Sequence, residues 1–340
     1  MLLTGDEGLR ELDLGRAVYL DTETTGLAGG AGTSVFMVGL GSFVESAGGG
    51  LKEFEVWQGF LRDFGAEAEL LSAVAERVRG SGGLVSFFGK SFDRHRLEDR
   101  MRMHGVEPPF EGLPHLDLYH PLRRIYGHVF ENGRLRTMER ELSGLEREDD
   151  LPGSQAPAAW FDYMHGRAHR LEGVFRHNLD DVLSLATLAG HLGSVRRGAD
   201  SEGEALAGPE DCRARAVGRA HLEARRREQG VRWIDRYLVL APEGRETRTE
   251  RWWRAEALRM GGEVEEAVAA LEELAGSGAD LLAARALRGL SMIQEHALGD
   301  REAAAERAAE GLRVLEGGEC GGEGAGLEGD LRRRLDRLER

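Results

Sequence analysis

Two acidic residues stand two positions apart in the run YLDTETTGL, where Asp21 and Glu23 end an apolar stretch. Alternate residues of an extended strand point to the same face, so we expect the two carboxylates to lie side by side. Such carboxylates repel each other, and a pair of Mg²⁺ or Mn²⁺ ions about 4 Å apart relieves the repulsion. Such an ion pair can activate water and stabilise the leaving oxygen of a phosphodiester. Taken alone, the D-x-E pattern is also compatible with an exposed strand end that runs into a turn.

Two later segments carry acids in a similar setting. In LVSFFGKSFDRHRLEDR an apolar strand leads into a turn, and a helix begins near Asp93, which could face the first pair or simply cap the helix. In VFRHNLDDVLSLATLAGHL, His177 and Asp181 are four residues apart, so a helix places them on one face as a general base and a metal ligand. The alternative is a solvated helix edge on which Asp180 and Asp181 are first-turn acids.

Short segments rich in β-branched and aromatic residues alternate with glycine-rich turns in the first part of the chain. They predict an antiparallel meander of three strands, then a helix and a fourth strand. A further helix, a short strand and three more helices follow, and an acidic segment with two prolines and two glycines predicts a surface loop. The fold class is therefore a mixed α/β sheet with flanking helices. The expected strands are residues 17–21, 34–44, 53–58, 84–88 and 115–118, the helices 64–79, 92–104, 135–142, 156–166 and 169–194, and the loop 143–157.

The last part of the chain is predicted to be all-α. Residues 198–211 combine glycine, proline and acids as linkers do, so we expect a first domain over 1–197 and a second over 212–340. In the second, Gly230, Gly262 and Gly299 precede amphipathic helices at spacings of 32 and 37 residues, close to the 34-residue period of tetratricopeptide repeats. An irregular helical bundle is the alternative. Val264, Val268, Leu271 and Leu274 form the expected apolar face of the middle unit, and Leu331, Leu335 and Leu338 that of a terminal cap.

Composition narrows the classes of function. The net charge is −15, and residues 1–200 carry 22 basic and 31 acidic side chains, which argues against broad electrostatic binding of nucleic acid in the absence of metal. The two cysteines, Cys212 and Cys320, have no paired spacing, so neither a disulfide framework nor a zinc site is indicated. Without a long apolar run or a secretory signal, we expect a cytoplasmic protein that does not enter a membrane.

In combination, the blocks LDTETTGL, GT-SVFMVGLG, GKSFDRHRLEDR, HLDLYHPLRRIYG, LRTMERELSGLEREDDLPG and HNLDDVLSL resemble the DEDD 3′–5′ exonuclease superfamily with its ribonuclease H-like fold, and most closely the YprB-like family. The resemblance covers about residues 16–195. It implies that Asp21, Glu23 and Asp181 hold the metal that activates the attacking water. Asp21 would bridge to a second metal that Asp93 supports, and His177 would orient or deprotonate the water. Some members carry tetratricopeptide-like repeats behind the nuclease domain, in agreement with the second half of this chain.

Two positions depart from the family pattern. Many relatives have asparagine where Phe88 stands, so a polar contact near the substrate or Asp93 is missing here. In the third motif, His177 and Asp181 are four residues apart, a spacing found in the subclass that has tyrosine in place of the histidine. The subclass that has histidine normally places its aspartate one position later than this. We therefore take Asp181 as the ligand and Asp180 as the fallback.

Other polar residues near these motifs have an ordinary explanation as well as a functional one. His115, Asp117 and His120 in HLDLYH are interpreted as strand-end residues near the site rather than as ligands. Arginines and a lysine close to the second motif could contact substrate phosphates or form a solvated charged face. These are Lys90, Arg94, Arg96, Arg123 and Arg124.

The resemblance thus implies a 3′–5′ exonuclease that needs two divalent metal ions, Mg²⁺ or Mn²⁺, and a nucleic acid with a free 3′ end. We expect DNA rather than RNA as substrate, on the basis of a role in repair, and a protein partner for the repeats, with a helicase as one candidate. The alternatives are a non-catalytic adaptor that acts through the helical repeats and a structure-specific endonuclease.

Overall fold

The computed structural model describes residues 2–26, 32–46, 52–148, 150–198, 208–317 and 321–340. They form two compact units, Leu3–Gly208 and Pro209–Arg340. The predicted linker, 198–211, is helical at Gly198 and at Glu210–Asp211, and its residues 199–207 lie outside the described part of the chain. No helix among the described residues is long and apolar enough to cross a membrane.

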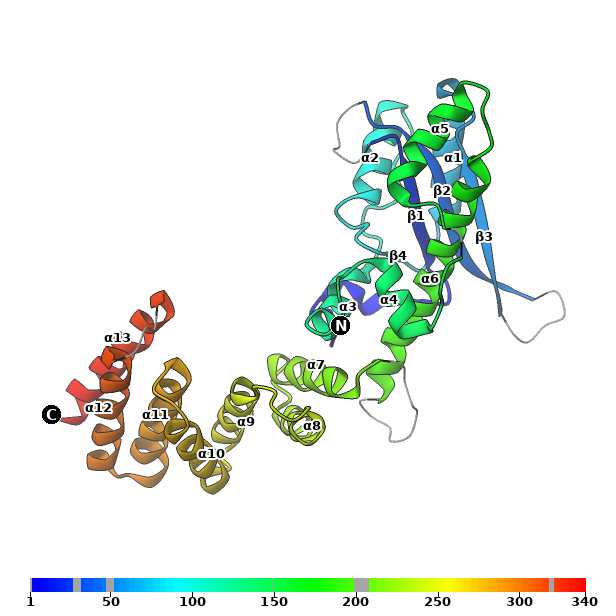
Figure 1. Cartoon of the computed structure of the whole chain (residues 1–340). Helices are drawn as coiled ribbons and strands as arrows, with labels where there is room; N and C mark the ends of the chain where they lie inside the picture. Colours follow the sequence, from blue (N-terminus) through cyan, green and yellow to red (C-terminus); the bar gives the residue numbers. More distant parts are fainter. Residues whose placement is uncertain (1, 27–31, 47–51, 149, 199–207, 318–320) are drawn as a thin grey trace. The chain divides into compact units, whose positions relative to one another are not determined.

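The first unit is built on a mixed five-stranded sheet with strand order β3-β2-β1-β4-β5 (Figure 1). The first three strands form the expected antiparallel meander, while β4 and β5 continue the sheet in parallel from β1. Because β1 is central, its two faces are covered and its apolar residues Val18 and Leu20 belong to the core. The strands are β1 Val18–Thr24, β2 Val35–Glu45, β3 Lys52–Phe60, β4 Leu84–Ser86 and β5 His115–Asp117.

The flanking helices agree with the predicted order, with one addition. α6 runs along the sheet in contact with β1, β2 and β3, whereas α1 and α2 pack on each other and on β3 and β2 (Figure 1). The helices are α1 Glu67–Val78, α2 Asp93–Met103, α3 Tyr119–Tyr126, α4 Leu135–Ser143, α5 Ala156–Met164 and α6 Leu171–Gly198.

α3 was not predicted, and β4 is shorter than the expected 84–88. Pro121 lies in the first turn of α3, where proline is tolerated because its missing N–H has no partner to lose. β4 stops at Ser86 because Phe88 adopts a left-handed conformation (φ 61°), which no strand can include.

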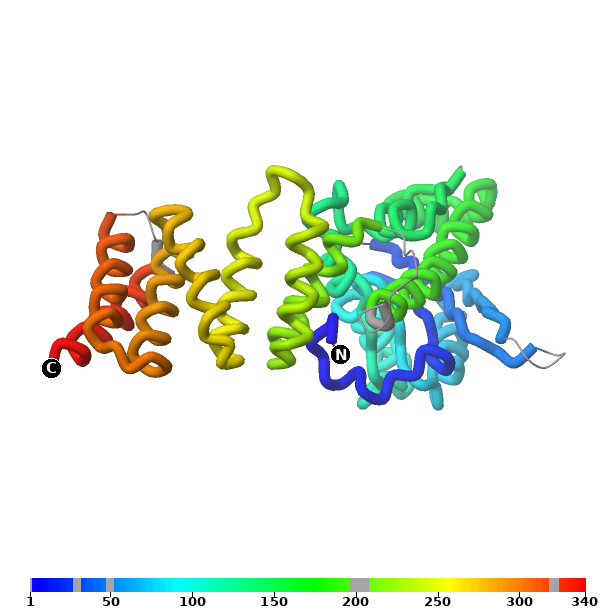
Figure 2. Tube along the Cα trace, turned by 90° about the horizontal axis from the view of Figure 1, so that it is seen from below, coloured from blue at the N-terminus to red at the C-terminus, as the bar shows by residue number. Residues whose placement is uncertain are grey.

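The second unit consists of helices that pack on one another in sequence, and α9 also contacts α7 and α11 (Figure 2). The predicted apolar face is present, since Leu271 and Leu274 are buried in one core with Val264 and Val268 packed against it. Leu331 and Leu338 of the terminal helix are buried as well. The helices are α7 Glu210–Glu223, α8 Arg227–Leu240, α9 Arg248–Gly261, α10 Val264–Gly276, α11 Leu281–Ile293, α12 Arg301–Gly317 and α13 Gly321–Leu338.

The prediction of a turn is wrong for one of the three glycines. Gly262 and Gly299 end helices with positive φ angles of 88° and 70°, as the C-terminal turns of helices favour. Gly230 instead lies inside α8 and is buried, and a Cβ there would come within 2.3 Å of Leu222 Cδ2. Its role is to let α7 and α8 approach closely, so the spacing of 32 residues does not mark a turn-to-turn repeat.

Candidate active site

β1 presents both acids of the first motif toward α6. The Asn178 amide nitrogen of α6 donates a hydrogen bond of 2.8 Å to Asp21 Oδ2. Glu23 Oε1 lies 3.9 Å from His177 Nε2, also on α6. The strand period therefore places Asp21 and Glu23 on the same side, as predicted.

The close approach of α6 to the sheet depends on two glycines of β2. Gly39 is paired with Asp21 across the antiparallel ladder. A Cβ at Gly39 would lie 2.5 Å from Asn178 Oδ1, and one at Gly41 would lie 2.7 Å from Val182 Cγ1. Because neither position has a side chain, the third motif can rest on the strand next to β1.

His177 and Asp181 lie one helical turn apart on α6 and face each other. His177 Nε2 is 3.6 Å from Asp181 Oδ2, and its Nδ1 is 2.8 Å from Asp150 Oδ1 in the loop after α4. Burial lowers the pKa of His177, but the charge of Asp181 and the hydrogen bond with Asp150 outweigh it, so the pKa is raised overall. The carboxylate that meets these partners is that of Asp181, which supports the choice of Asp181 over Asp180.

Asp93 begins α2 but does not serve as its N-cap. The N-cap residue is Phe92, which makes no side-chain capping bond, whereas Asp93 Oδ1 accepts a short hydrogen bond from the Thr22 hydroxyl on β1. A Cβ at Gly89 would come within 2.7 Å of Asp93 Oδ2, so this glycine leaves room for the carboxylate. The helix start thus connects Asp93 directly to the strand of Asp21 and Glu23.

The four carboxylates share one electrostatic environment. Burial raises the pKa of Asp21 well above its usual range, and the charges of Asp181 and Asp93 raise it further. Burial raises the pKa of Glu23 to about 8 and that of Asp93 to about 6. Burial also raises the pKa of Asp181, although His177 and Arg147 counteract it. Burial and the charges of the neighbouring carboxylates therefore disfavour the ionised form of each acid in the cluster.

This excess of carboxylate oxygen suits divalent metal ions. Mg²⁺ and Mn²⁺ prefer oxygen ligands, and their charge would favour the ionised carboxylates, which burial and, to a smaller extent, mutual repulsion disfavour. Among the described residues, no three His, Cys, Asp or Glu side chains are arranged to hold an ion as they stand. Three of the four carboxylates are turned to a neighbour: Asp21 to Asn178, Asp93 to Thr22, and Asp181 to Arg147 at 2.6 Å.

Sequence reasoning missed a buried ion-pair network behind the site. Arg147 lies between Asp181 and Glu139 of α4, with its Nε 2.9 Å from Glu139 Oε2, and its side chain is only 4% exposed. Asp150 of the same loop holds His177 Nδ1. These residues fall in the block LRTMERELSGLEREDDLPG, where the loop was expected at the surface. The only indication of this network in the sequence was the close alternation of acidic residues and arginines in this block.

The HLDLYH residues stabilise the turn that precedes Asp93. Asp117 accepts hydrogen bonds of 2.8 and 3.1 Å from the backbone nitrogens of Phe88 and Lys90. Burial lowers the pKa of His115 to about 3, so its ring is neutral, and its Nε2 lies 2.7 Å from Ser86 Oγ. His115 and Asp117 lie in β5, and His120 lies in the first turn of α3.

Phe88 adopts the left-handed conformation with φ 61° and has 49% of its surface exposed. Asparagine tolerates this conformation better than bulky residues do. Backbone geometry therefore offers a reason for asparagine at this position besides a polar contact.

Several of the basic residues proposed for phosphate contacts already have partners. Lys90 Nζ is 3.0 Å from Asp6 Oδ2, Arg94 Nε is 2.7 Å from Glu98 Oε1, and Arg123 Nη1 donates a 2.6 Å hydrogen bond to the Tyr119 hydroxyl. A phosphate would have to compete with these partners, so their role in substrate binding stays a prediction.

Comparison with known proteins gives the class to which this fold and site belong. Residues 18–193 match the model of the RNase H superfamily, and the chain is therefore a member of that superfamily. Its nuclease domains hydrolyse phosphodiester bonds of nucleic acids and typically use divalent metal ions.

A particular relative is the uncharacterized protein YprB of Bacillus subtilis (strain 168), which is 31% identical over 228 residues. The match covers 65% of this chain and 51% of the relative, so the chain spans about half the length of the curated protein that it matches.

Proposed function

We propose that this protein is a 3′–5′ exonuclease of the DEDD type that hydrolyses DNA in preference to RNA, in DNA repair or nucleic-acid processing. The observation that carries the proposal is the meeting of Asp21, Glu23, Asp93 and Asp181 from β1, α2 and α6 in one buried cluster with raised pKa values. Such a cluster destabilises the metal-free protein, which is understandable if its purpose is to bind cations.

In this proposal, Asp21, Glu23 and Asp181 would hold one divalent ion, and Asp93 would support a second together with Asp21. Such ions would lower the pKa of the attacking water and stabilise the charge on the leaving 3′ oxygen. Asn178 orients Asp21 through its 2.8 Å hydrogen bond. Gln58 in turn orients Asn178, because Gln58 Nε2 donates to Asn178 Oδ1 at 2.9 Å.

His177 is proposed to orient the attacking water or to accept its proton. Its Nδ1 is fixed by Asp150, which leaves Nε2 facing the space beside Glu23 and Asp181. A water held there would meet a nitrogen whose ring cannot rotate away. This restriction is what general-base catalysis requires of its base.

The helical unit is proposed to contain tetratricopeptide-like repeats that recruit a protein partner, for which a helicase that supplies an unwound strand is a candidate. We also propose that residues 1–197 form the separate nuclease domain. Both proposals rest on the sequence patterns described above.

The direct test uses purified protein with 5′-end-labelled single- and double-stranded DNA and RNA, in Mg²⁺ or Mn²⁺. A ladder that shortens from the 3′ end, absent in chelator and in Asp181→Asn but present in Asp180→Asn, is the expected result. Cutting of a circular single strand would indicate an endonuclease instead. Absence of cleavage in either metal, together with absence of metal binding by calorimetry, would indicate the adaptor.

A further inference from the structure

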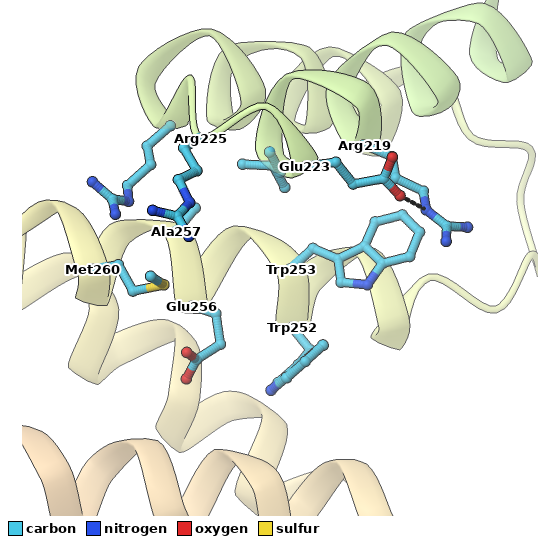
Figure 3. A pocket seen from close by; sticks show the side chains of 10 residues that line it. Arg219, Glu223, Arg225, Trp252, Trp253, Glu256, Ala257 and Met260 are labelled. Carbon is cyan, nitrogen blue, oxygen red and sulfur yellow. Dashed lines mark hydrogen bonds and ion pairs between the residues drawn. The ribbon is translucent and has the colours of Figure 1, made fainter. Parts of the chain in front are cut away.

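The second unit contains a pocket between α7 and α9 that the proposed nuclease chemistry does not use (Figure 3). Its volume is about 390 Å³, and its apolar lining comes from Leu222, Trp252, Trp253, Ala257 and Met260. Met260 is 55% exposed, so an apolar surface of this site is open to solvent. Both indoles already have cations against their rings, since Arg215 and Arg219 lie 5.3 and 5.2 Å from the Trp253 ring centroid and Arg285 lies 5.1 Å from that of Trp252. A base that enters the pocket would therefore meet aromatic rings and guanidinium groups together.

The pocket is bordered by the most basic part of an acidic chain. Residues 213–236 contain eight arginines and three acids, a net charge of +5, whereas the whole chain has −15. Arg219 and Arg225 line the pocket together with the acids Glu223 and Glu256 (Figure 3). Arg227 belongs to the lining as well. Arg219 is paired with Glu223 at 2.9 Å, and its guanidinium lies 5.2 Å from the Trp253 ring centroid.

The arginines of the α7–α8 turn are not neutralised. Within the described part of the chain, Arg225, Arg226 and Arg227 form no ion pair and no side-chain hydrogen bond. Elsewhere in this unit many arginines are paired, for example Arg248 with Asp280 and Arg254 with Asp235. Three adjacent free guanidinium groups beside an apolar pocket fit a ligand that carries both negative charge and flat apolar surface.

Arg225 occupies a position where glycine is usual. It follows the end of α7 with φ 58°, and its N–H donates to Leu222 O while the N–H of Arg226 donates to His221 O. This helix ending favours glycine, since a side chain in the left-handed region costs about 1 kcal/mol. A strained arginine at the edge of a pocket is the kind of outlier that marks a functional position.

We infer that the pocket and the arginines Arg225–Arg227 bind single-stranded nucleic acid, with phosphates on the guanidinium groups and a base in the Trp252–Trp253 pocket. The inference rests on the proposed function, since it supposes that nucleic acid is the substrate of the same chain. Cationic side chains beside aromatic rings are the usual means of holding single strands without reading their sequence.

Two observations favour a nucleic acid over an acidic peptide. The pocket offers two indole rings rather than an aliphatic cavity, and every base has a face that can stack on them. The first 200 residues carry a net charge of −9, which opposes the binding of phosphate in the absence of metal. A nuclease of this charge needs a second, cationic surface for affinity, and the α7–α8 hairpin provides one.

The test measures binding of a fluorescein-labelled (dT)30 strand to the full chain by anisotropy in EDTA, where no cleavage occurs. Replacing Arg225–Arg227 by Gly, Ala and Ala should weaken binding about 100-fold at 0.1 M salt and reduce the salt slope by about 2. Trp253→Ala should weaken it about tenfold. Arg313→Ala, an exposed arginine of α12, is the matched control and should bind as the wild type does.

Arg225→Gly alone separates binding from folding. It removes a cation and also relieves the left-handed strain, so the melting temperature should stay the same or rise while binding weakens about fivefold. Unchanged binding by the triple variant would overturn the inference, as would a glutamate-rich peptide of equal charge that binds as tightly as (dT)30. A wild type that binds through these arginines but cleaves no substrate in metal would refute the proposed nuclease and leave this inference standing.

Discussion

Arg147 Nη2 lies 2.6 Å from Asp181 Oδ1, so a buried arginine of the protein itself contacts one of the four carboxylates proposed to hold metal. The same guanidinium binds Glu139, whose side chain is 1% exposed. A metal ion at Asp181 would therefore share that carboxylate with Arg147. The arginine limits the repulsion within the cluster when no metal is bound.

Replacing Arg147 by methionine should destabilise the protein by about 3–5 kcal/mol, because Glu139 is left buried without its partner. The measurement is urea unfolding in EDTA. The double variant Arg147→Met, Glu139→Gln should recover the part of the loss that comes from Glu139, because that side chain is then uncharged, whereas Asp181 still lacks the guanidinium of Arg147. A single variant as stable as the wild type would show that the network contributes no net stability.

Alanine at Asp21, Glu23, Asp93 or Asp181 should abolish most nuclease activity while the circular dichroism spectrum is preserved. Each substitution removes a proposed metal ligand and relieves charge repulsion, so stability in EDTA should hold or rise for Asp21 and Glu23. Asp180→Ala is the control and should remain active. Loss of activity in Asp180→Ala with activity retained in Asp181→Ala would reverse the assignment of the third motif.

The stability of the metal-free protein should fall as pH rises from 5 to 8. The pKa of Glu23 is about 8 in the folded protein against an ordinary 4.5, so the folded state binds more protons than the unfolded state across this interval. Melting curves in EDTA of the wild type and Glu23→Gln should coincide near pH 5 and diverge above it, with the variant more stable at pH 8. Saturating Mn²⁺ should raise the wild-type melting temperature at pH 8 more than that of the variant. Parallel curves in EDTA would contradict the raised pKa.

His177→Ala should lower kcat by about 10²–10⁴-fold with metal affinity and KM largely unchanged, as expected for loss of a positioned base. The wild-type rate should rise with pH as the imidazole loses its proton, and the alanine variant should lack this rise. Asp150→Asn keeps a hydrogen-bonding partner for Nδ1 but not its charge, and should give a smaller loss. An unchanged pH profile in His177→Ala would leave this histidine without a catalytic role.

A shortened chain ending at Gly208 should fold and still degrade short single strands. α6 continues to Gly198 and buries Val195, and Gly208 packs on Leu142 of the same unit, so a chain that ended before Val195 would lose part of the core. Thermal melting and cleavage of a short labelled strand are the measurements. An insoluble or inactive protein would show that the helical unit is needed to complete the nuclease.

The sequence predicted the strands and helices that carry the acids, because local patterns determine them. The glycine-bounded apolar runs gave the meander, and the four-residue spacing of His177 and Asp181 placed both on one face of α6. α3, a helix of 8 residues with Pro121 in its first turn, was not predicted. Gly230 was misplaced because a glycine that serves close helix packing has the same local signature as one in a turn.

The network behind the site could not be predicted in the same way. Glu139, Arg147 and Asp181 are held together by contacts between residues that are distant in sequence, and a charged loop ordinarily predicts a solvated surface. Its burial depends on whether each charge meets a partner, which only the three-dimensional arrangement decides. The role of Asn178 could not be predicted either, because its hydrogen bond joins it to Asp21, which is distant in sequence. In the motif HNLDD, the histidine and the aspartates are the residues whose types indicate chemistry.

Gly39 sets how closely α6, which carries Asp181, approaches the sheet strand that carries Asp21, because it has no side chain. Gly39 is paired with Asp21 across the antiparallel ladder. Asn178 of α6 occupies the space that a side chain at position 39 would fill. Even one added methyl group would push α6, and Asp181 with it, away from β1. We therefore expect Gly39 to tolerate as few replacements as the acids themselves, although it carries no functional group and would touch neither metal nor substrate.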